Sequence, residues 1–436
     1  PSPTVHCQMK PPTNPAVVAS HLTLLGLWLV SQYVYLPYPI HLLTLVTAIL
    51  YVASHQSLFL CPEVHDKLLK QQEEEDADNS THSSMSVEPR ETMRKEDAYQ
   101  FPLVGSCALF GLYMAFKYLD KDLVNLLIGI YFSVAGVVAM TMTFSTYVEG
   151  IIPNKFNQER RLGWQWIQPH SLPEWLAGPS PCDLSVQVTP AQFISFIKAV
   201  VVLVLYHTSQ KAWYLNNIMG ISFCLQGIRN FSVGSYQIAA ILLIGLFFYD
   251  IFWVFGTEVM VKVATNLDGP IKLLLPRDSL EKDPETGRLN LSLLGLGDIV
   301  IPGFFLSLML RWDFYQWSQN VQQQQQQQQQ SSESDKNKNY YNPIHVEHVS
   351  FPKPYFHCTL CGYIVGLGTT LWVMFQFNAA QPALLYLVPA CLGSSFGCAL
   401  VKGQVKALME YTEEEEEVPA EGGASGEKTL GQKKDE

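Results

Sequence analysis

The chain has 436 residues, of which 48% are hydrophobic and only 15% are charged, whereas ordinary soluble domains carry roughly 25% charged residues. Its mean hydropathy of +0.10 averages strongly apolar segments with polar loops. Acidic runs in the loops and the tail supply most of the net charge of −11, which gives no indication of nucleic-acid binding. We therefore expect an all-α polytopic membrane protein that contacts the lipid bilayer and no nucleic acid.

Ten apolar segments approach the roughly 20 residues that cross a bilayer as a helix. They lie near residues 16–36, 40–60, 101–119, 123–145, 191–208, 212–228, 235–257, 290–310, 355–378 and 381–401. The segment at 16–36 follows a proline-rich start without an initiator methionine. Either this segment is an extra span, or the chain is truncated or carries a signal-like leader.

Composition divides the chain into seven regions. An N-terminal region with one or two apolar segments (1–60) is followed by an acidic polar linker (61–100), a helical bundle (101–228), two acid-bearing spans with their connecting loop (229–311), a glutamine-rich low-complexity loop (312–354), two C-terminal helices (355–402) and an acidic tail (403–436). The uninterrupted glutamine tract and the tail both have compositions typical of disordered segments.

The nine cysteines are dispersed and odd in number, so they do not predict a disulfide framework. The run "HCTLC" from His357 to Cys361 has a metal-like spacing but lacks a second pair. We interpret these thiols as buried apolar groups and expect no metal and no other cofactor. Glycosylation sequons at Asn79, Asn230 and Asn290 are weak signals by themselves.

Two carboxylates stand in consecutive apolar segments. Asp250 lies in "LIGLFFYDIFWVFG", about seven residues before that segment ends, and Asp298 lies about eight residues after "NLSLLGLGDIVIPGFFLSLML" begins. Consecutive spans run antiparallel, so both acids should lie about 10–12 Å from the same membrane face. Gly295 and Gly297 remove side chains beside Asp298 and would let another backbone approach.

Two acids held together in a low dielectric share one proton. One can then act as a base toward water while the other protonates a peptide carbonyl oxygen, as peptide hydrolysis requires. Paired intramembrane acids also occur in proton relays and cation transporters. The depth of Asp250 and Asp298 favours neither function over the other.

A third motif, "QFNAAQPALLYLVPACL", distinguishes the two. Pro382 lacks an N–H group and follows Gln381, so an uninterrupted helix is not expected there. Irregular backbone at membrane depth is tolerated only where protein or a watery cavity covers it. A kinked helix explains one proline but not the whole set of features.

With "YD" at 249–250, "LGLGD" at 294–298 and "QPALLYLVP" at 381–389, the sequence resembles the GxGD intramembrane aspartyl proteases over roughly residues 100–410. The longer forms "YDIFWVFGT", "LGLGDIVIPG" and "QPALLYLVPA" are similar to signal peptide peptidase rather than to presenilin. The resemblance implies nine core spans, cleavage within the membrane, and signal peptides or other type II membrane segments as substrates. The segment at 16–36 and the glutamine tract depart from the family pattern, and homo-oligomerisation is left open.

The resemblance also implies roles for particular residues. Asp250 and Asp298 would be the catalytic pair, and the other residues that would line the active site are Tyr249, Gly295, Leu296, Gly297, Gln381, Pro382, Ala383 and Leu384. Rival interpretations are an ion or proton transporter that uses the same acids, and a scaffold that binds membrane helices without cleaving them. No further ionisable relay in the other spans supports a transporter.

The tail ends "KKDE", and Lys433 with Lys434 resembles a dilysine signal for retrieval to the endoplasmic reticulum. That signal requires a cytosolic tail, which would put residues 258–289 in the lumen, although the basic residues of this loop fit the positive-inside tendency poorly. Within the loop, "VMVKVAT" and "IKLLLP" are predicted to be extended, and the alternative is a helix extension or a segment at the membrane surface. Such a strand could pair with an unwound substrate.

Overall fold

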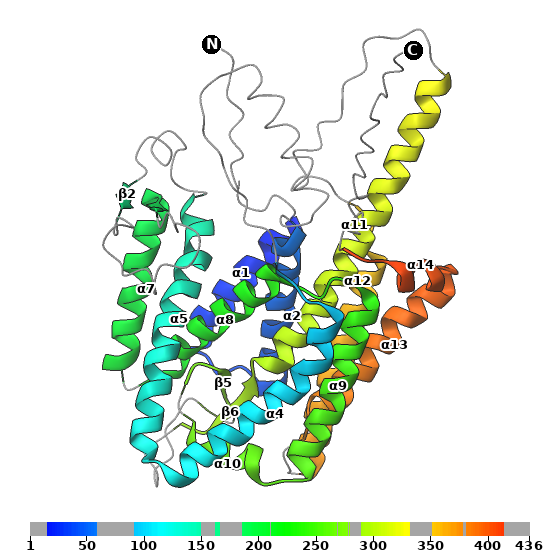
Figure 1. Ribbon diagram of the computed structural model, residues 1–436. Coiled ribbons are helices and arrows are strands. Elements are labelled where there is room, and N and C mark those ends of the chain that lie inside the picture. Colours follow the sequence, from blue (N-terminus) through cyan, green and yellow to red (C-terminus); the bar gives the residue numbers. More distant parts are fainter. Residues whose placement is uncertain are drawn as a thin grey trace, which may run out of the picture.

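The computed structural model describes residues 15–58, 91–149, 162–165, 185–209, 211–267, 269–277, 279, 289–331, 351–377 and 381–413. A long helix lies in each of the ten predicted apolar segments (Figure 1). These helices are α1 (Pro15–Val30), α2 (Tyr38–Ser57), α4 (Lys95–Tyr118), α5 (Lys121–Glu149), α7 (Pro190–Thr208), α8 (Trp213–Asn230), α9 (Tyr236–Phe255), α11 (Gly297–Ser331), α12 (Pro354–Phe377) and α13 (Leu384–Lys402). Short helices α10 (Val259–Asn266) and α14 (Val405–Glu410) complete the helical set of the described residues.

Seven of the described helices, α2, α4, α5, α7, α9, α12 and α13, are long and apolar enough to cross a membrane. This confirms the predicted fold class, an all-α polytopic membrane protein. Helix α1 has 16 residues and is shorter than those seven. It nevertheless packs against α2, and the Trp28 indole donates a hydrogen bond to the carbonyl of Tyr214 at 2.9 Å. The segment that departs from the family pattern is therefore part of the bundle.

Three short two-stranded sheets accompany the helices. Strand β1 (Glu91–Thr92) runs parallel to β4 (Phe231–Ser232), β2 (Leu162–Gln165) is antiparallel to β3 (Ser185–Val188), and β5 (Lys272–Pro276) is antiparallel to β6 (Leu291–Gly295). Figure 1 shows β5, β6 and α10 at the end of the bundle opposite the glutamine-rich extension of α11. Strand β6 ends at Gly295, directly before α11 begins.

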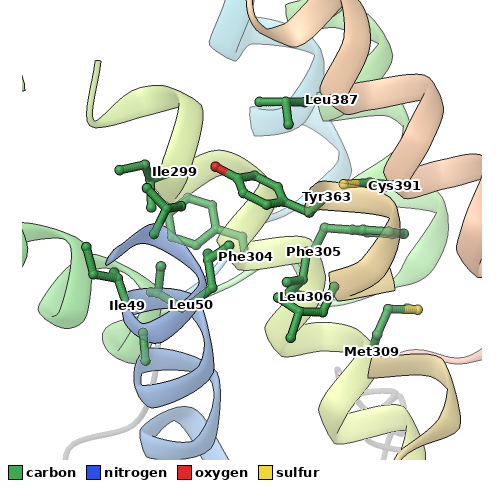
Figure 2. Close-up of a cluster of buried hydrophobic side chains, with 14 of the residues drawn as sticks. Ile49, Leu50, Ile299, Phe304, Phe305, Leu306, Met309, Tyr363, Leu387 and Cys391 are labelled. Atoms are coloured by element: carbon green, nitrogen blue, oxygen red, sulfur yellow. The ribbon is translucent and has the colours of Figure 1, made fainter. Parts of the chain in front are cut away.

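Helix α11 occupies the centre of the bundle and contacts α2, α8, α9, α12 and α13. Its residues Phe305, Leu306 and Met309 are almost fully buried in the main core. Figure 2 shows them between α2 and the helices that carry Tyr363 and Cys391. The peripheral helices α4, α5 and α7 instead expose leucine, isoleucine, valine and phenylalanine side chains, as lipid-facing helices do. Packing in the core thus positions α11, while the exposed apolar side chains of the peripheral helices are suited to contact with lipid.

The structure corrects two predictions about the segments that flank the acids. Asp298 was expected about eight residues inside a helix, but residues 291–295 form β6 and Asp298 lies in the first turn of α11. Backbone pairing with β5 extends this apolar segment. The segment "VMVKVAT", predicted to be extended, is helix α10, because tertiary context outweighs the weak strand preference of its valines. The segment "IKLLLP" contains β5, as predicted.

The glutamine tract also differs from the prediction. Residues 312–331, expected to open a disordered loop, continue α11 to Ser331. Glutamine has a good helix propensity, and extending an existing helix avoids the cost of nucleation. Residues 332–350 and the tail beyond residue 413 lie outside the described residues.

Candidate active site

Asp250 projects from α9 into the protein interior and is only 4% exposed. Its Oδ2 atom accepts a hydrogen bond of 3.0 Å from the backbone N–H of Leu384, the first residue of α13. The first amides of a helix have no partner within the helix, so the carboxylate of Asp250 satisfies one of them from another helix. Pro382, just before this turn, has no N–H to compete. The two motifs, distant in sequence, therefore meet at one hydrogen bond.

Asp298 reaches the same region from the first turn of α11. Helix α11 contacts α9, the helix that carries Asp250. The hydroxyl of Tyr363, on α12, donates a hydrogen bond of 3.1 Å to the backbone carbonyl of Asp298. In Figure 2 this hydroxyl points toward the start of α11, near Ile299, with Leu387 on the adjoining helix. The hydrogen bond from Tyr363 thus holds the start of α11, and with it the backbone of Asp298, against α12.

Two glycines, Gly295 and Gly297, flank the turn between β6 and α11 that leads into Asp298. A methyl group at Gly295 would lie 3.4 Å from its Oδ2 atom, while a methyl group at Gly297 would have no neighbour within 4 Å. The backbone N–H of Leu296 donates a hydrogen bond of 3.0 Å to the carbonyl of Ile271, which holds the turn in place. A side chain at residue 295 would therefore contact the Asp298 carboxylate, whereas a side chain at residue 297 would meet open space.

The remaining predicted site residues lie at the start of α13 and on the face of α9 that contacts α4. Ala383 and Leu384 are buried at the start of α13, and Pro382 is buried beside them. Tyr249 points its ring at α4, where a methyl group on Gly105 would lie 3.7 Å from Cε2 of the tyrosine. Gln381 lies at the beginning of the same turn, with its Oε1 atom 3.5 Å from the hydroxyl of Tyr386.

The β5–β6 sheet has one occupied edge and one open edge. Asn217 of α8 pairs with Leu274 of β5 through two hydrogen bonds, of 2.7 Å to its carbonyl and 2.9 Å from its N–H. Leu274 is opposite Leu293 in the antiparallel register, so the backbone groups of Leu293 face away from β5. No other strand pairs with β6 among the residues that the structure describes. The open edge runs directly toward Gly295 and Asp298.

Sequence reasoning missed three groups that shape this site: Tyr363, Asn217 and the α4 residues near Tyr249. Tyr363 and Asn217 are polar residues within largely apolar segments, and that is the signal that could have found them. On α4, the Ser106 hydroxyl accepts a hydrogen bond of 3.1 Å from the Trp253 indole. No group of three metal-binding side chains gathers within the described ranges.

Comparison with known proteins identifies the relatives of this fold. The family model for signal peptide peptidase matches residues 85–415. The chain belongs to the signal peptide peptidase family. Within that family it is 37% identical to signal peptide peptidase of Mus musculus and 36% identical to that of Homo sapiens, in each case over 331 residues that cover 76% of this chain and 76% of the relative. It is also 40% identical to intramembrane protease 2 of Caenorhabditis elegans, over 48% of this chain and 41% of the relative.

Membership in this family makes the chain a protease, and its apolar helices make it a multi-pass membrane protein. The lipid bilayer is its environment, and its substrates are membrane-embedded. The match begins at residue 85, so α1 and α2 precede the region that the family model covers. The sequon at Asn79 and the lysines Lys433 and Lys434 lie outside the described residues.

Proposed function

We propose that this protein is an aspartyl endopeptidase in which Asp250 and Asp298 activate a water molecule to hydrolyse peptide bonds within transmembrane segments. The observation that carries the proposal is the meeting of the Asp250 carboxylate with the Leu384 amide beside the first turn of α11. Two acids from separate helices share one site, which suits general acid–base catalysis. The apolar core packed around these helices supports the proposal, because a low dielectric would strengthen the coupling between the two carboxylates.

In the proposed reaction one acid is ionised and the other is protonated. The ionised carboxylate takes a proton from water as the water oxygen attacks the peptide carbonyl carbon, and the protonated acid gives its proton to the carbonyl oxygen. A tetrahedral gem-diol results without a covalent bond to the enzyme. When the C–N bond breaks, the acid that took a proton from water gives it to the amide nitrogen, which leaves as the amine, and the other carboxylate takes a proton from a hydroxyl of the gem-diol. The product carboxyl forms, and the pair again has one ionised and one protonated acid. The Leu384 N–H keeps Asp250 oriented throughout these steps.

Substrate binding is proposed to use the open edge of β6. Helical substrates shield their amides, so a cleavable segment must unwind and find new backbone partners. Leu293 offers an N–H and a carbonyl away from β5, two residues before Gly295. A substrate strand paired there would lead its backbone toward the two acids. Remnant signal peptides and type II membrane segments are the substrates that we propose.

The proposed location is the endoplasmic reticulum membrane with a cytosolic C-terminus. The support is the dilysine pattern at Lys433 and Lys434, together with the family. In this orientation β5 and β6 face the lumen. Replacing both lysines with serine should move the protein out of the endoplasmic reticulum, and unchanged localisation would contradict the retrieval role.

The test of the catalytic proposal is cleavage of a signal-peptide substrate by purified protein. Asp250→Asn and Asp298→Asn should each abolish turnover, whereas Asp122→Asn, at an exposed acid of α5, should leave it unchanged. A substrate analogue with a hydroxyl isostere should block cleavage by the wild type. Substantial cleavage by either dyad variant would refute the proposal, and so would ion flux through proteoliposomes in the absence of proteolysis.

The strand-pairing proposal has a matched pair of variants. Leu293→Pro removes the N–H group that points away from β5. Leu293→Ala shortens the same half-exposed side chain but keeps this N–H group. An edge strand tolerates proline, so both variants should fold. We expect kcat/KM to fall about tenfold in Leu293→Pro, the loss of roughly one hydrogen bond, and to change little in Leu293→Ala. Equal effects of the two variants would contradict pairing at this edge.

A further inference from the structure

Arg311 is a buried cation far from the two acids. Its side chain has no exposure to solvent, and its Nε atom pairs with the Glu413 carboxylate at 2.5 Å. Its Nη1 and Nη2 atoms donate to the hydroxyls of Ser57, at 3.1 Å, and Ser232, at 2.9 Å. Ser232 also donates a hydrogen bond to the carboxylate of Glu413. We call these four residues the clasp, and none of them takes part in the proposed proton transfers.

The clasp joins the helices that carry the two acids. Arg311 follows Asp298 on α11 by 13 residues, about 20 Å at the helical rise of 1.5 Å per residue. Ser232 belongs to β4, just before α9, which carries Asp250. One carboxylate, that of Glu413, therefore contacts the middle of α11 through Arg311 and, through Ser232, the strand that precedes α9 by four residues.

The backbone around Glu413 is anchored as firmly as its side chain. The N–H of Glu413 donates a hydrogen bond of 2.7 Å to the carbonyl of Gly234, and Thr412 forms a β-bridge with Ser235. Ser235 caps α9 by accepting a hydrogen bond of 3.2 Å from the N–H of Ile238. The segment after α14 is thus fixed to the two residues that directly precede α9. In Figure 1, α14 lies at the end of α13 that is away from β5 and β6.

The same C-terminal segment contacts Asp250 at its other end, because α13 begins with the amide that donates a hydrogen bond to that acid. Catalytic groups must be held to within about 0.5 Å, and a sliding movement of one helix along another would exceed that tolerance. We infer that Arg311 and Glu413 are positioning residues, which fix the axial register of α9, α11 and α13 and so hold the two acids in the geometry for catalysis. This inference rests on the proposed function of the dyad.

The test measures full-length Glu413→Gln, which keeps the shape of the side chain and removes its charge. The matched control is Glu410→Gln on α14, where the partner Lys406 lies 3.8 Å away and the two side chains are 65% and 89% exposed. For each protein, kcat, KM, the Kd of the hydroxyl isostere and the number of isostere-binding sites are measured. We expect Glu413→Gln to lower kcat and weaken isostere binding by the same factor, about tenfold, with KM and the number of sites unchanged. Glu410→Gln should match the wild type.

A merely structural role predicts a different result. If the pair only keeps the protein folded, the number of isostere-binding sites falls while the Kd of the remaining sites is unchanged, and that outcome would overturn the inference. Unchanged kcat would overturn it as well. If Glu413→Gln does not fold, Glu413→Asp keeps the charge but shortens the side chain; a fall in kcat with a parallel weakening of isostere binding supports positioning, and wild-type values for both refute it. A wild type that neither cleaves nor binds the isostere would instead refute the proposed function.

Discussion

Alanine at Gly362 should weaken the contact between α12 and α13. A methyl group at this position would lie 2.7 Å from the carbonyl oxygen of Ala390 and would also clash with the Ser394 hydroxyl. Gly366, one turn later, is similarly crowded by the carbonyl oxygen of Tyr386 at 3.0 Å. The pair forms a G-x-x-x-G pattern, which lets membrane helices approach closely. Helix α13 starts at the turn that binds Asp250, so its displacement should reach the site.

The magnitude follows from the distances. An ordinary contact begins at 3.4 Å, so relieving the clash with Ala390 requires a movement of at least 0.7 Å (3.4 − 2.7). Overpacking of this kind costs about 1–3 kcal/mol. Gly368, on the same helix, has no atom within 4 Å of an added methyl group. Alanine gains roughly 1 kcal/mol of helix propensity at either position, so the difference between the two variants isolates the cost of the clash.

The assay is reversible unfolding of purified protein in mixed micelles, followed by circular dichroism during titration with a denaturing detergent. We expect Gly362→Ala to be about 1–3 kcal/mol less stable than Gly368→Ala, and its kcat for a signal-peptide substrate to fall more than tenfold. Equal stabilities would refute the packing argument. Equal kcat values despite a difference in stability would refute the link from this interface to Asp250.

Three further changes test the shell around the site. Tyr363→Phe removes the hydrogen bond to the carbonyl of Asp298, and we expect a loss of about 1 kcal/mol in unfolding free energy with a reduced kcat; an unchanged kcat would show that this bond does not orient α11. Asn217→Leu leaves both backbone groups of Leu274 without their partner. We expect a loss of about 1–3 kcal/mol in unfolding free energy for each group, measured by the same detergent titration, and a variant as stable as the wild type would contradict this expectation. Gly245→Ala brings a methyl group to 2.9 Å from the ring of Pro102 on α4. Because α4 must then move away from α9, KM and kcat should both change. Wild-type kinetics would show that α4 can move without affecting the site.

The sequence by itself contained the strongest signals of this protein. Apolar length predicts helices, because backbone polar groups in hydrocarbon must be satisfied within the segment, and a helix lies in each of the ten segments. An acid in such a segment costs free energy and so indicates function, which singled out Asp250 and Asp298. The motif after Gln381 distinguished a protease from a transporter, and the family match is consistent with that distinction.

Only the tertiary structure decided how these pieces meet. Apolar alternation could not separate β6 from the start of α11, since pairing with β5 is a contact across a loop. It could not tell that "VMVKVAT" is helical. Nor could it connect Arg311 to Glu413, because residues that are 102 positions apart come together only when the bundle closes. Local composition fixes which segments enter the membrane; the partners of a buried polar group depend on the whole fold, since each such group must find a partner wherever the chain supplies one.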